Sequence, residues 1–77
     1  MIFLIEYDRA AGHIVTLKTF EPSKRSAAEK ARLDLEILLN QQGVEREVVV
    51  LEAASEEALR RTHRRYFEDI NELVKAS

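Results

Sequence analysis

The chain has 77 residues, no cysteine, and 12 Lys and Arg against 14 Asp and Glu, for a formal net charge of −2. This length predicts a single domain, 1–77, and the absence of cysteine excludes disulfides, thiolate metal sites and a thiol nucleophile. The balanced charge gives no overall attraction to nucleic acid or anionic membranes, and no apolar run approaches the ~20 residues of a membrane span. We therefore expect a cytoplasmic protein without a membrane segment or signal peptide.

Three segments are apolar at consecutive as well as alternate positions, which is typical of strands buried on both faces. They are Met1–Tyr7, His13–Phe20 and Val44–Ala53. Between the first two, Asp8 suits the opening of a turn and Gly12 suits the φ > 0 position that closes a hairpin loop. The sequence therefore predicts an antiparallel hairpin, with a third strand later in the chain.

After the hairpin the apolar period changes from two residues to nearly four, which indicates a helix. This helix is predicted to start at about Pro22 or Ser26, because Ser26 and Glu29 have the spacing of a capping box. It is predicted to end at Gln42, with Gly43 in the left-handed position that follows many helices.

The first helix is predicted to be apolar in two directions. At 100° per residue its main stripe is Ala28, Ala31, Leu35, Leu38 and Leu39. Leu33 and Ile37 fall on the far side of the helix, where the stripe does not reach. They form a second apolar site.

A second helix is predicted from the N-cap Ser55, where Glu56 and Glu57 favour the positive end of the helix dipole, to about Val74. Its apolar arc includes His63 and is expected to pack on the sheet. A lone histidine in such a place is most often a structural residue.

The predicted order is ββαβα, an α+β fold in two layers. The first strand is the most apolar and is placed in the centre, so the expected order is 2-1-3 with every neighbour antiparallel and both helices on one face. Order 1-2-3, with the second and third strands parallel, remains the alternative.

With both helices on one face, the other face of the sheet is expected to be open to a partner. The predicted interface residues are Ile2, Leu4, Ile14, Val48 and Val50, together with Leu33 and Ile37 on the helix. The third strand could instead present Val49 and Leu51, since alternation alone does not decide. A contiguous apolar patch of this kind on a soluble domain usually marks an interface.

No arrangement of residues predicts catalysis, a metal or a cofactor. Glu6 and Asp8 followed by Thr16 and Lys18 resemble the metal-binding strands of one nuclease superfamily, but Thr16 stands where a second carboxylate is needed. Two histidines in the chain, without a helical His pair, make a poor ligand set. We expect a protein that is not an enzyme.

The second helix carries a cluster of arginines that could contact phosphates. These are Arg60, Arg61, Arg64 and Arg65, and each has an acid one turn away in Glu56, Glu57, Glu68 or Asp69. A neutralised, solvated face is the preferred interpretation.

The sequence thus predicts a small non-catalytic interaction or accessory module that binds itself as a homodimer, or binds another protein. The alternative is a nucleic-acid-binding module that uses the arginines of the second helix.

Overall fold

The computed structural model describes residues 1–68, and its elements follow the predicted order. The strands and helices are β1 (Ile2–Asp8), β2 (His13–Phe20), α1 (Arg25–Gln42), β3 (Glu47–Glu52) and α2 (Glu56–Thr62). Short 3₁₀ turns precede α1 at Pro22–Lys24 and follow α2 at Arg64–Tyr66. No helix in the described part of the chain is long and apolar enough to cross a membrane.

The sheet has three strands in the order β2-β1-β3, and β1 is antiparallel to both neighbours. The α+β class, the strand order and the two helices are thereby confirmed, and the alternative order 1-2-3 is wrong. β1 lies in the centre because six consecutive residues from Ile2 to Tyr7 are buried. Such a strand needs cover on both faces.

The hairpin loop forms as predicted from its turn residues. The Asp8 side chain accepts a hydrogen bond from the Ala11 N–H (3.0 Å), and the Gly12 N–H donates to the Asp8 carbonyl (2.7 Å). Gly12 has φ 72°, which a residue with a Cβ rarely adopts. The bond from Ala11 holds the pKa of the Asp8 carboxyl below its ordinary value.

A β-bulge in β2 changes which face its residues occupy. Glu6 pairs with Thr16 and Tyr7 pairs with Ile14, so Val15 is left without a partner residue in β1. The extra residue reverses the facing of the strand beyond it. Ile14 was predicted beside Ile2 and Leu4, and this is wrong, because Ile14 packs on the opposite face.

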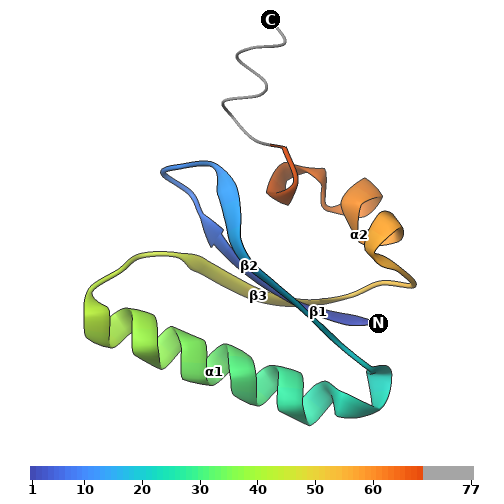
Figure 1. Ribbon diagram of the computed structural model, residues 1–77, viewed down its shortest axis with the longest axis horizontal. Coiled ribbons are helices and arrows are strands. Elements are labelled where there is room, and N and C mark those ends of the chain that lie inside the picture. The colour runs from blue at the N-terminus through green and yellow to red at the C-terminus, as the bar shows by residue number, and fades with distance from the viewer. Residues whose placement is uncertain (69–77) are drawn as a thin grey trace, which may run out of the picture.

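The two helices cover opposite faces of the sheet (Figure 1). On one face α2 packs on a core whose buried members are Phe3, Ile5, Tyr7, Leu59 and Tyr66. α1 lies on the other face, against β1 and β3. The prediction of both helices on one face of a two-layer domain is therefore wrong, because β1 is apolar on both sides and the chain itself covers both.

Both ends of α1 lie where they were predicted, but the predicted capping box does not form. Gly43 has φ 66°, and the Val44 N–H reaches back to the Leu39 carbonyl (2.9 Å). At the other end Lys24 precedes the helix without a side-chain hydrogen bond, so the predicted capping box of Ser26 and Glu29 does not start it. The preceding 3₁₀ turn already carries the chain into a helical path.

α2 starts at its predicted cap and ends earlier than predicted. The Ser55 hydroxyl accepts a hydrogen bond from the Ala58 N–H (3.1 Å). The Thr62 hydroxyl donates to the Ala58 carbonyl (3.0 Å), which competes with continuation of the helix. The predicted end at Val74 lies outside the described residues.

Candidate interaction surface

The interface residues predicted from the sequence occupy three different environments. Ile2 and Leu4 are 1% and 2% exposed, so the sheet face expected to be open is closed by α1. Val48 and Val50 are half-buried on this same face, and Ile14 is half-buried on the face that α2 covers. None of these side chains forms an open apolar groove.

The open question about the third strand is resolved by the two-sided packing. Val49 and Leu51 join the core under α2, while Val48 and Val50 point towards α1. Both pairs are half-buried.

The outer surface of α1 carries the predicted second apolar site. Leu33 is 52% exposed and Ile37 is 48% exposed. They lie four residues apart and are therefore neighbours on the helix surface. Leu38, predicted in the buried stripe, is also 48% exposed, and it lies about 100° further round the helix. We call Leu33, Ile37 and Leu38 the α1 patch.

Ion pairs flank the α1 patch along the helix. Lys30 and Asp34 form one pair (3.8 Å), and Arg32 bonds to both Glu29 and Glu36 (3.1 Å each). Pairs of this exposure contribute little to stability. They give the apolar patch a polar rim, which is the usual composition of a protein interface.

A buried ion pair lies beneath α1 at the centre of the sheet. The Glu6 side chain is 5% exposed and accepts hydrogen bonds from Arg46 (2.6 Å) and from the Thr16 hydroxyl (2.8 Å). A carboxylate in such a place must be paired, since an isolated buried charge is very unfavourable. The two bonds join β1 to β2 and to the residue that precedes β3.

A cleft of about 530 Å³ opens beside this ion pair. It lies between the hairpin loop at Arg9, the last turns of α1 and the start of β3. Its polar lining includes Arg9, Glu36, Glu45 and Arg46. Side chains of both charge signs therefore line the cleft.

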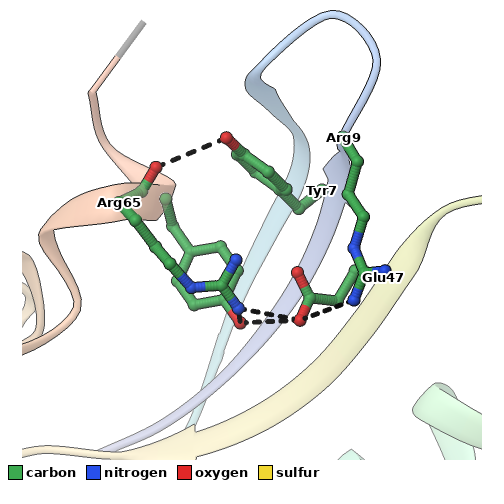
Figure 2. Close-up of polar contacts among 5 residues, drawn as sticks. Tyr7, Arg9, Glu47 and Arg65 are labelled. Carbon is green, nitrogen blue, oxygen red and sulfur yellow. Dashed lines mark hydrogen bonds and ion pairs between the residues drawn. The ribbon is translucent and has the colours of Figure 1, made fainter.

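Glu47 joins three separate segments on the opposite face (Figure 2). One carboxylate oxygen accepts from Arg65 (2.8 Å) and from the Tyr66 hydroxyl (3.2 Å), and it pairs with Arg9 of the hairpin loop (3.5 Å). The Tyr66 ring meets the Tyr7 ring edge-on, with centroids 5.2 Å apart. This cluster fixes the 3₁₀ turn after α2 to the sheet.

Charge and burial act on the acids of this cluster in opposite directions. The hydrogen bond from Arg65 holds the pKa of the Glu47 carboxyl below its ordinary value, although desolvation opposes this. Burial raises the pKa of the Tyr66 hydroxyl. Glu47 is therefore a charged structural residue at neutral pH.

Two of the four arginines predicted for nucleic acid are paired as expected. Arg60 bonds to Glu56 (3.1 Å) and Arg61 bonds to Glu57 (2.6 Å), each across one turn of α2. Arg60 also lies over the Phe67 ring, 4.5 Å from its centroid. These contacts neutralise the helix surface.

The other two arginines lie after α2. Arg65 bonds to Glu47 on β3, and its predicted partner Asp69 lies outside the described residues. Arg64 is exposed in the 3₁₀ turn. The four side chains therefore do not form one continuous helical surface.

His63 follows the last residue of α2, half-buried, with its ring 6.3 Å from the Tyr66 ring. Among residues 1–68 no group of three or more His, Asp or Glu side chains could hold a metal ion.

Neither Glu47 nor Arg9 was predicted as a site residue from the sequence. Their meeting depends on the pairing of β1 with β3 and on the turn after α2. An acid at the start of an apolar strand is the only local signal.

The chain was compared with protein-family models, with curated proteins and with solved structures, and no match was found in any of the three.

Proposed function

We propose that this chain is a non-catalytic protein-interaction module, an accessory protein of the cytoplasm that works as a homodimer. The observation that carries the proposal is the α1 patch, in which three aliphatic side chains stay about half exposed on one helix. Among the described residues a helix covers each face of the sheet, and the outer side of α1 carries three of the large apolar side chains that stay exposed.

Burial of a Leu or Ile side chain contributes about 1.5–3 kcal/mol, and half of that area is still in water for each member of the patch. Two copies that cover each other's patches would together gain several kcal/mol before the cost of association. That gain supports micromolar affinity when other contacts contribute.

The nucleic-acid alternative has weaker support. Arg60 and Arg61 already bond to acids on their own helix, and Arg65 bonds to Glu47. A phosphate would have to replace these partners.

Light scattering after gel filtration tests the proposal over protein concentrations from about 1 μM to about 1 mM. We expect a dimer, and we expect Leu33→Lys to raise its dissociation constant about tenfold or more because a charge would enter the contact. Val15→Lys is the matched control, since Val15 is 42% exposed on β2 and lies outside the patch. A wild-type chain that stays monomeric at the highest concentration would contradict the homodimer.

A further inference from the structure

The sheet has two edges, and no helix among residues 1–68 covers either of them. The described part of the chain is only 12 Å deep along its shortest axis, the direction viewed in Figure 1. Three strands spaced about 4.8 Å apart account for that depth. Because α2 lies above the sheet and α1 below it in this view, the edge strands β2 and β3 form the two flat sides of the described part of the molecule.

The β2 edge has features that oppose pairing with another strand. The bulge at Val15 interrupts its hydrogen-bonding pattern, and Lys18 lies exposed further along it. Bulges and lysines are two of the ways in which natural proteins protect an edge strand.

The β3 edge has neither protection. Its sequence from Glu47 to Glu52 is Glu-Val-Val-Val-Leu-Glu, without Lys or Pro, and its pairing with β1 is regular throughout. A regular apolar edge of this kind is a template for a further strand.

The backbone groups that β3 offers can be identified. The Ala53 N–H donates to the Met1 carbonyl (3.0 Å), so the odd-numbered residues of β3 bond to β1. The N–H and C=O groups of Val48, Val50 and Glu52 therefore point away from the sheet.

We propose that two copies of this chain pair β3 with β3 in antiparallel orientation, joining their sheets into one of six strands. The inference rests on the proposed homodimer and names its surface. A two-fold axis perpendicular to the sheet keeps both α1 helices on the same face of the joined sheet. Residues that lie opposite each other must then face the same helix, so even-numbered residues of β3 pair with even-numbered ones and odd with odd.

Charge selects the register among these possibilities. When Val49 lies opposite Val49 of the second copy, Val48 faces Val50, and Arg46 faces Glu52 at both ends of the contact. If the register shifts so that Val50 lies opposite Val50 of the second copy, Glu52 faces Val48 and loses this charged partner. Glu52 has a 60% exposed side chain, and the Arg46 guanidinium, although bonded to Glu6, keeps further donors for a second carboxylate.

Leu33, one member of the α1 patch, continues this surface. α1 lies against β1 and β3, and Arg25 on α1 pairs with Glu52 (3.5 Å), so this side of the helix faces the β3 edge. Leu33 lies about 80° round the helix from Arg25, between that side and the outermost Ile37. Edge pairing would bring the two α1 helices side by side and cover Leu33.

Cysteine crosslinking tests the register directly, since the natural chain has no cysteine. In the proposed pairing the two Val49 residues form a pair without hydrogen bonds, with Cα atoms about 4.5 Å apart, within the range of a disulfide. Val49→Cys should therefore form a disulfide-linked dimer when oxidised glutathione is added, seen by non-reducing electrophoresis.

Two matched variants control the crosslinking. The Cα atoms of the two Val50 residues would lie about 8 Å apart, beyond disulfide reach, so Val50→Cys should link no faster than Thr19→Cys on the exposed side of β2. Circular dichroism checks that each variant is folded.

A charge reversal provides a second measurement without cysteine. Glu52→Arg should weaken the dimer about tenfold in sedimentation equilibrium, because two arginines would then face each other. Glu57→Arg, a change of the same charge on α2, should leave the dimer unchanged.

The outcomes separate the two proposals. A wild-type dimer in which Val49→Cys links no faster than Thr19→Cys, or in which Glu52→Arg has no effect, overturns the edge pairing and leaves the homodimer in place. A wild-type monomer overturns both. Fast linking of Val49→Cys alone, with a weakened Glu52→Arg dimer, supports both.

Discussion

The two faces of the sheet are covered by helices of very different length. α1 has 18 residues, and it covers aliphatic side chains of β1 together with the buried Glu6 and Arg46 pair. α2 has seven residues and covers a core that is rich in aromatic rings, where Tyr7 and Tyr66 meet edge-on. One central strand supplies both cores by alternation of its side chains.

The difference shows how each helix is held. A helix of seven residues is not stable by itself, so α2 depends on Leu59 in the core and on the Glu47 contacts that follow it. α1 runs along the whole length of the sheet, and in addition it has apolar side chains that the sheet does not cover. The long helix is therefore the one that can serve both a core and a partner.

The largest effect is expected from opening the α1 face. Leu4→Ala should lower the free energy of unfolding by about 2–5 kcal/mol, because it leaves a cavity at a residue that is 2% exposed. Leu33→Ala, at 52% exposure, should lower it by only about 0.5 kcal/mol. Urea denaturation followed by circular dichroism measures both. Equal losses would show that Leu4 is not covered by α1.

The burial of Leu4 also determines what the variant Leu4→Lys should do. If β1 lay on an open face, this variant would remain folded and become monomeric. Under α1 it should instead unfold, since the ammonium group would be buried without a partner.

The next effect concerns the buried charge on the same face. Glu6→Ala should lower the free energy of unfolding by about 1–3 kcal/mol, because Arg46 and Thr16 lose their shared acceptor. Glu56→Ala, which breaks an exposed pair with Arg60 on α2, should cost about 0.5 kcal/mol or less. Urea denaturation compares the two variants. If Glu6→Ala left the free energy of unfolding unchanged, the pair of Glu6 and Arg46 would not be formed.

The sequence predicted the hairpin and the C-terminal end of α1 because each depends on nearby residues, and it predicted the strand order because β1 is the most apolar strand. Asp8 and Gly12 define a loop, and Gly43 defines a helix end, within a few positions of the chain. The placement of α2 depends instead on long-range packing. Strands that are apolar on both faces were interpreted as evidence for a partner, whereas the second helix supplied the cover.

The candidate site was predicted less well for a related reason. Leu33 and Ile37 follow from helical periodicity, which is local, and both are exposed as expected. Ile14 was misplaced because a single bulge residue, Val15, reverses which face of the sheet the neighbouring side chains occupy. No Gly or other turn residue in β2 indicates this bulge in the sequence.

On the α2 face a smaller, pH-dependent effect is expected from Glu47. Its folded pKa lies below the ordinary 4.5, so the unfolded chain takes up the proton first as the pH falls. The stabilisation is thus complete above pH 4.5 and is lost as the pH falls through the folded pKa. Glu47→Gln should make stability less dependent on pH in this window, as measured by thermal denaturation at a series of pH values. An unchanged pH profile would contradict the role given to Arg65.

The smallest effect is expected from the arginines, and it separates a structural role from a nucleic-acid surface. Arg61 is paired with an exposed acid on its own helix, so Arg61→Glu should change the free energy of unfolding by no more than about 0.5 kcal/mol. Binding of the wild-type chain to DNA or RNA should be no tighter than the ~10⁻⁴ to 10⁻⁶ M of non-specific contact, and should weaken steeply as salt is added. Fluorescence anisotropy with single-stranded and duplex probes measures this. Sub-micromolar binding at physiological salt that Arg61→Glu removes, while the dimer persists, would contradict this expectation. It would make the arginines of α2, rather than the outer side of α1, the functional surface.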